Sequence, residues 1–207
     1  YKKILKGGIF FFFFIYILVT QTVTNISKIL KLFTRKPYNH VSISCDPNLQ
    51  EMYSFCRNTP EKPLPATFNK EIVGEGTFGK FSNIPCEIYK IPVSGRQKNL
   101  ITKNLEHFKN NREYYSYNLI GLGLIFLHIA YNRKNKFVCS QFVSHILEKS
   151  EVDLDFSKPS CLLTPEDFRH VDSAELIYKG ELNAFYKMKN RHSETFAIPA
   201  EQTFHSA

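Results

Sequence analysis

Two residues far apart in the chain could act together on a carbonyl group: Cys139 and His40. Cys139 opens a stretch, residues 139–147, whose apolar side chains recur at the spacing of one helix face. The free N–H groups and the dipole at a helix start favour the thiolate, which is the form that attacks a carbonyl. The same N–H groups can bind a developing oxyanion. A buried structural cysteine is the alternative interpretation of Cys139.

Residues 38–55 alternate in the manner of two short strands joined by a turn, with His40 entering the first strand. A histidine that faces the cysteine can activate the thiol, and its other ring nitrogen then needs a polar partner. We expect Tyr53 to be that partner, because odd parity in an antiparallel strand would put its hydroxyl on the face of His40. Ser54 and Glu51 are weaker alternatives.

A histidine strand that precedes a cysteine helix reverses the order found in papain. The arrangement resembles the circularly permuted papain-like group, which includes the YaeF/YiiX amidases and the lecithin retinol acyltransferase family and is related to NlpC-type peptidases. The resemblance covers roughly residues 15–180. It is carried by four stretches: Asn39-His40-Val41-Ser42-Ile43, Tyr53-Ser54-Phe55, Phe137 to Val143, and Leu163-Thr164-Pro165-Glu166-Asp167-Phe168.

The resemblance implies Cys139 as nucleophile and His40 as base, with the third member of the site falling on Tyr53. It implies no metal and no organic cofactor. The family usually has Glu, His or another polar residue in the third position. A tyrosine carries no charge near neutral pH, so it would stabilise an imidazolium less than a carboxylate does.

The length of 207 residues suits one compact domain. We expect an α+β, permuted papain-like domain over residues 15–190, with an antiparallel sheet or small barrel packed against helices and the nucleophile at a helix start. Residues 1–14 would form a basic and apolar N-terminal extension, and residues 191–207 a flexible tail. Capping residues predict a further helix over 26–33.

The N-terminal run Ile9–Val19 has the order of charge and apolar residues found in a signal peptide. At eleven residues it is shorter than the ~20 that a membrane-spanning helix needs. The competing interpretation is that Ile15 to Thr20 is a buried strand of the sheet, which the resemblance favours. The sequence therefore predicts a cytoplasmic protein that either stays free or associates with a membrane, and it leaves export open.

Other stretches have simpler interpretations. Residues 74–79 are rich in glycine but lack the ending of a phosphate-binding loop, so a turn between strands is expected there. Residues 97–112 show a helical period, and the apolar residues 122–130 predict a core helix or a lip of the substrate groove. Residues 175–188 look like a final hairpin. His107 and His128 are interpreted as structural.

The formal net charge of +8, from 27 basic and 19 acidic residues, favours anionic partners. The charges are scattered and no nucleic-acid-binding motif is present, so we expect no nucleic-acid partner. The five cysteines form an odd number without regular spacing, which is typical of a reducing compartment. A zinc site from His40, Cys45, Cys56 and Cys86 receives little weight because short paired spacings are missing.

The leading hypothesis is a cysteine-dependent hydrolase or acyltransferase that acts on an amide or ester through an acyl-enzyme. Its substrate could be a cell-wall peptide or a lipid, and contact with a membrane surface is expected from the charge and the apolar N-terminus. Two alternatives remain. One is a non-catalytic binding module on the same fold, which Tyr53 would favour, and the other is a small protein anchored by its N-terminal Phe run. The sequence does not reveal the oligomeric state.

Overall fold

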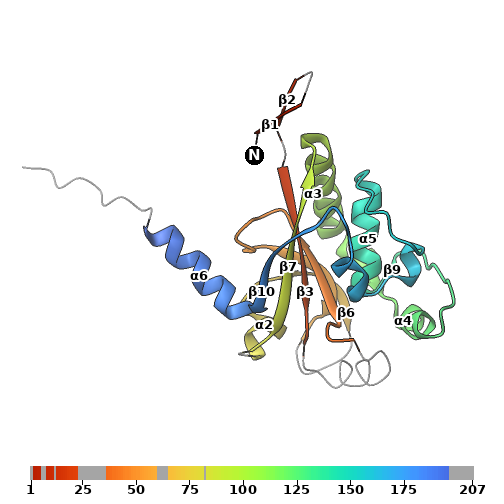
Figure 1. Ribbon diagram of the computed structural model, residues 1–207. Helices are drawn as coiled ribbons and strands as arrows, with labels where there is room; N and C mark the ends of the chain where they lie inside the picture. Colours follow the sequence, from red (N-terminus) through yellow and green to blue (C-terminus); the bar gives the residue numbers. More distant parts are fainter. Residues whose placement is uncertain are drawn as a thin grey trace, which may run out of the picture.

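The computed structural model describes residues 2–5, 8–11, 13–22, 36–59, 65–81 and 83–195. It is an α+β structure in which helices pack against a six-stranded antiparallel sheet of order β10-β7-β3-β4-β5-β6 (Figure 1). The strands of this sheet are β3 (Phe13–Thr20), β4 (His40–Ser44), β5 (Met52–Arg57), β6 (Ala66–Glu71), β7 (Pro85–Val93) and β10 (Glu175–Glu181).

The helices are α2 (Gly76–Lys80), α3 (Gly95–Asn110), α4 (Leu119–Phe126), α5 (Cys139–Lys149) and α6 (Leu182–Thr195). Short 3-10 turns lie at η1 (Arg112–Tyr114), η2 (Ser160–Leu162) and η3 (Pro165–Arg169). Two small pairs of strands complete the described part: β1 (Lys2–Leu5) with β2 (Gly8–Phe11), and β8 (Ser116–Tyr117) with β9 (Lys136–Phe137).

The strand β3 occupies the middle of the sheet. It pairs with β4 on one side and with β7 on the other, both antiparallel. Ile15 to Val19 are buried because both faces of β3 are covered, and a strand covered on both faces reads as a continuous apolar run. The strand interpretation of Ile15 to Thr20 is therefore confirmed. The helix predicted over residues 26–33 lies outside the described residues.

Two hydrophobic clusters lie on the two faces of the sheet. Ile15, Ile17 and Val19 belong to the larger cluster, which includes the buried sides of α3 and α5. Tyr16 and Leu18 alternate with them and belong to the smaller cluster, which includes residues of α2 and α6. This alternation is the period of two expected of a strand. Helix α5 packs against β4 and β5, and thus against the strand that carries His40.

Two predictions of local structure are wrong. Residues 76–80 form the short helix α2 rather than a plain turn. The expected hairpin over 175–188 is β10 followed by α6. Leu182 and Phe185 are both buried in the smaller cluster, and this spacing of three residues fits a helix face, not a strand. Helix α6 projects away from the sheet (Figure 1) and runs into the predicted tail.

Within the described residues, no helix has the length and apolar character that crossing a bilayer requires.

Candidate active site

Helix α5 begins at Cys139, as the sequence predicts. The residue before it is Val138, whose side chain has no oxygen to cap the first turn. Polar side chains fix this turn from outside. Ser140 Oγ donates to the carbonyl oxygen of Leu163 at 2.6 Å, and Gln141 Nε2 donates to that of Cys161 at 3.0 Å. The position of Cys139 is therefore set by hydrogen bonds from the two residues that follow it.

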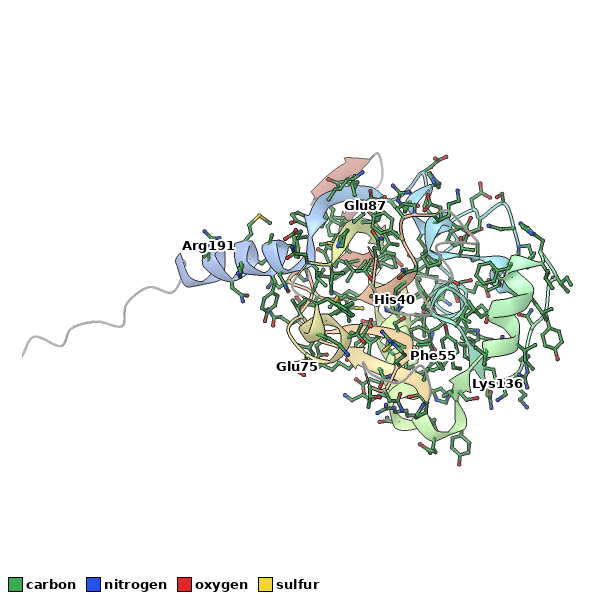
Figure 2. All side chains as sticks on the ribbon, turned by 90° about the horizontal axis from the view of Figure 1, so that it is seen from below. His40, Phe55, Glu75, Glu87, Lys136 and Arg191 are labelled. Atoms are coloured by element: carbon green, nitrogen blue, oxygen red, sulfur yellow. The ribbon has the colours of Figure 1, made fainter. Side chains whose placement is uncertain are left out.

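His40 is the first residue of β4, and it is buried together with a carboxylate. Its Nε2 lies 2.9 Å from Oε1 of Glu71, the last residue of β6. Ser42 Oγ donates to Oε2 of the same carboxylate at 2.5 Å. Both oxygens of Glu71 are thus engaged, and His40 has an acidic partner that holds its ring. Figure 2 shows His40 in the interior of the molecule.

The charges of His40 and Glu71 stabilise each other. Burial alone disfavours a charged imidazole, but the carboxylate of Glu71 and hydrogen bonds to Cys139 and Glu71 raise the pKa of His40 to about 10. Burial also opposes ionisation of Glu71, yet the charge of His40 and hydrogen bonds from His40, Ser42 and Cys56 lower the pKa of that carboxyl below its usual value. At neutral pH the pair is therefore an imidazolium and a carboxylate.

The thiol of Cys139 lies close enough to His40 to raise the pKa of that imidazole. Nε2 of His40 faces the Glu71 carboxylate and, at 3.3 Å, Ser42 Oγ. The structure thus brings together Cys139 and His40, two residues that the sequence singles out, and adds Glu71.

Tyr53 does not lie beside His40, contrary to the expectation. It pairs directly with Ile43 across β4 and β5, and directly opposed residues point to the same face of a sheet. His40 is three residues from Ile43 and so has the opposite parity. The hydroxyl of Tyr53 instead donates to Glu51 Oε2 at 2.8 Å, and its ring stacks on Phe68. Burial and the Glu51 carboxylate raise the pKa of Tyr53 well above its usual value.

A second cysteine belongs to the same neighbourhood. Burial, followed by the nearby charge of Glu71, raises the pKa of the Cys56 thiol well above that of a free thiol. Cys56 therefore keeps its proton. The five cysteines form no disulfide, and the described residues contain no group of three or more His, Cys, Asp or Glu side chains arranged to hold a metal.

A cavity of about 310 Å³ opens beside Cys139. Most of its wall is apolar or aromatic, and the charged side chains Lys36, Lys158 and Glu166 also contribute to it. Helix α4 forms part of the wall, so it is a lip of this cavity. The apolar and aromatic lining comes from Tyr38, Tyr117, Leu122, Ile125, Phe126, Val138, Leu163 and Pro165.

The start of α4 is tied to the start of α5. Asn118 Oδ1 accepts from the backbone N–H of Gly121 at 3.0 Å and so caps α4. Asn118 Nδ2 donates to Gln141 Oε1 at 3.1 Å. Any Cβ at position 121 would meet the Asn118 side chain at 2.2 Å, so this cap requires glycine. The cavity lip and the cysteine helix are therefore held together by one buried amide pair.

Three residues of this region were not singled out for a role from the sequence. Glu71 ends a short strand in which only Ala66 and Phe68 mark a buried face, and nothing in that pattern predicts a buried acid. Tyr117 lines the cavity, and burial raises its pKa, so it keeps its proton. His128 also lines the cavity and has a positive φ of 55°, so it lies just beyond α4 and not on a helix.

Other histidines lie elsewhere. His145 is on α5 but packs against Phe108 and Phe137, and burial lowers its pKa. His107 lies on α3, with Nε2 3.2 Å from the hydroxyl of Tyr115.

Comparison of this chain with protein-family models, with curated proteins and with solved structures gives no match.

Proposed function

We propose that this protein is a cysteine-dependent acyl-transfer enzyme of the permuted papain-like group, with Cys139 as nucleophile, His40 as its proton partner and Glu71 as the group that orients His40. The observation that carries the proposal is His40 held between the Cys139 thiol and the Glu71 carboxylate. This is the arrangement of nucleophile, base and orienting group used in covalent catalysis.

The fold supports the same proposal. A histidine strand, an antiparallel sheet and a later helix that begins at the nucleophile occur here in the order of the permuted group. An acid at position 71 also weakens the case for a non-catalytic binding module, because that alternative was based on an uncharged orienting residue. Glu71 supplies the charge that Tyr53 would have lacked.

The reaction would proceed in two steps. The Cys139 thiolate attacks the carbonyl carbon, and the oxyanion is met by the N–H groups at the start of α5. The bond to the leaving amine or alcohol then breaks, the imidazolium of His40 gives its proton to that group, and a thioester remains. In the second step His40 takes a proton from water or an acyl acceptor, which attacks the thioester and frees Cys139.

Thiol labelling tests the nucleophile. We expect iodoacetamide at mildly acid pH to modify Cys139 before the other four cysteines, as read by peptide mass mapping, because an imidazolium and a helix start both favour the thiolate. Cys139→Ala should remove the fast-labelled peptide, and His40→Gln should slow its labelling. Cys161→Ala, which removes another buried cysteine, is the matched control and should label like the wild type. Equal labelling of the wild type and Cys139→Ala would contradict the proposal.

Activity is tested with a panel of acyl amides, peptides and phospholipids. A mass increase equal to the acyl group, located on Cys139 and absent from Cys139→Ala, would identify both the acyl-enzyme and the substrate class.

A further inference from the structure

The surface around α4 is unusually apolar. Among the described residues, nine large hydrophobic side chains are exposed, and six of them lie between positions 114 and 131. Leu127 is 67% exposed, Ile120 57%, and Leu119 and Ile129 each 50%. Single exposed apolar residues are ordinary, but a cluster of this kind marks a surface that another phase or molecule covers.

The same helix has a second, inward side. Leu122, Ile125 and Phe126 line the cavity that contains Cys139, and His128 joins them just after the helix. One side of α4 is thus a wall of the candidate active site while the other carries Ile120 and faces solvent. Whatever covers the exposed side is placed next to the cavity.

The charges around this surface have one predominant sign. Residues 114–132 contain no Asp, Glu, Lys or Arg; Arg112 and Glu113 precede them, and Arg133, Lys134 and Lys136 follow. Lys36, Lys158 and one acid, Glu166, line the cavity behind α4, so the basic residues outnumber the acidic ones. Figure 2 shows Lys136 at the periphery of the molecule. An apolar surface with basic residues along its border complements a layer of anionic headgroups over acyl chains.

The dimensions fit a helix that lies on a bilayer. Helix α4 has 8 residues, far fewer than the ~20 needed to span one. Tyr114 and Tyr131, which are 67% and 44% exposed, bracket the apolar residues, and tyrosine favours the boundary between headgroups and acyl chains. A second copy of this chain is a poorer occupant, because a two-fold contact would set the basic residues 133–136 against themselves.

We propose that residues 119–131 dock this protein onto an anionic lipid bilayer, and that an amphiphilic acyl lipid passes from the bilayer into the Cys139 cavity. The docking is independent of the chemistry, whereas the choice of substrate rests on the proposed function. The membrane contact is thereby assigned to α4, since Phe14 to Thr20 of the Phe-rich run are paired within the sheet.

Docking is tested by co-sedimentation of the full chain with vesicles. The Cys139→Ala protein is used so that no substrate is consumed, with vesicles of phosphatidylcholine alone or of equal parts phosphatidylcholine and phosphatidylglycerol. We expect binding to the mixed vesicles and weaker binding to phosphatidylcholine alone. The double variant Ile120→Glu/Leu127→Glu should weaken binding by at least ~10-fold, because each change replaces an apolar side chain that the bilayer would bury with a carboxylate.

A matched control is Leu176→Glu on β10, where the side chain is 48% exposed on another part of the molecule. It should bind like the parent protein, and thermal unfolding should show that both variants are folded. The proposal is overturned if the parent protein does not bind mixed vesicles, if the double variant binds as well as the parent, or if the parent is a dimer that the double variant converts to a monomer.

The chemistry is separated from docking by a second measurement on proteins that retain Cys139. Ile120→Glu/Leu127→Glu should label with iodoacetamide at the wild-type rate but should form less acyl-enzyme from a lipid ester held in vesicles. Normal labelling without vesicle binding would remove the docking proposal and leave the proposed function standing. Vesicle binding without selective labelling of Cys139 would remove the proposed function and leave the docking proposal standing.

Discussion

Two buried carboxylates of the sheet, Glu71 on the edge strand β6 and Glu87 on β7, have opposite characters. Glu87 pairs with Val19 near the end of β3, and Thr20 pairs there with His40, the partner of Glu71. Figure 2 shows Glu87 apart from His40. Glu71 meets a histidine, a serine and a cysteine, none of which carries a permanent charge.

Glu87 meets cations instead. Arg169 Nε lies 2.6 Å from its Oε2, and Lys179 Nζ lies 3.1 Å from its Oε1. Tyr89 donates a further hydrogen bond at 2.6 Å. Although burial opposes its ionisation, these hydrogen bonds and charges lower the pKa of Glu87 to about 2. The same Arg169 also reaches Glu166 of the cavity wall, at 2.5 Å.

The difference in partners distinguishes a structural carboxylate cluster from one that can take part in a reaction. An arginine cannot release its proton in a protein, so the Glu87 cluster can only hold its elements in place. A histidine can exchange its proton, so the Glu71 cluster can take part in a reaction. The degree of burial is similar in the two cases, and it is the kind of partner that distinguishes them.

The largest expected effect is on stability. Arg169→Met should lower the free energy of unfolding by ~3–5 kcal/mol, because it leaves Glu87 buried with incomplete compensation. Urea denaturation measures the change. In the folded variant, iodoacetamide should still label Cys139 selectively, and a loss of that selectivity with little change in stability would reverse the assignment of the two clusters.

A smaller effect, and of the opposite kind, is expected at Glu71. Glu71→Gln removes the charge that holds His40 protonated, and the labelling rate of Cys139 at mildly acid pH should fall on the order of 100-fold. Glu51→Gln is the matched control, because Glu51 is the carboxylate beside Tyr53. If Glu51→Gln slowed labelling as much as Glu71→Gln, the result would favour Tyr53, and not Glu71, as the residue that orients His40.

The two clusters should also differ in pH dependence. The pKa of Glu87 is depressed by folding, so its contribution to stability is present above about 4.5 and is lost as the pH falls toward about 2. The pKa of His40 is raised by folding, so its contribution is present below about 6.5 and is lost as the pH rises through about 10. Urea midpoints measured across this range should show both losses. Arg169→Met should flatten the acid side and His40→Gln the alkaline side.

The smallest effect is expected at Tyr53. Tyr53→Phe removes one hydroxyl that donates to Glu51, so stability should change by about 1 kcal/mol or less. Labelling of Cys139 should be unchanged. A marked loss of labelling would show that Tyr53 acts on His40 despite its place on the opposite face.

The sequence predicts those parts of the fold that repeat a pattern over several residues. The strand at Ile15–Thr20, the helix that becomes α3 and the start of α5 at Cys139 are all predicted in this way. His40 at the beginning of β4 is visible as well. Each depends on neighbours in sequence, which the amino-acid pattern records directly.

The position of Glu71 cannot be predicted from the sequence, because it does not depend on neighbours in sequence. Its place beside His40 depends on the register of three strands, β4, β5 and β6, and a shift of one residue in any pairing would turn it to the other face. The expectation that Tyr53 lies beside His40 assumes another pairing of β4 with β5 than the one that the structure has. The exposure of one side of α4 could not be predicted either, since an apolar run gives no sign of whether it is buried.

The position of β3 also has a consequence for synthesis of the chain. Its partner β4 follows soon in the chain. The other edge of β3 pairs with β7, as in the pair Phe13–Val93, so that edge stays unpaired until β7 has left the ribosome. An unpaired, Phe-rich edge at that stage can associate with other nascent chains. Cys139 is translated only after β4 and β7, so both partners of β3 are available before the nucleophile is made.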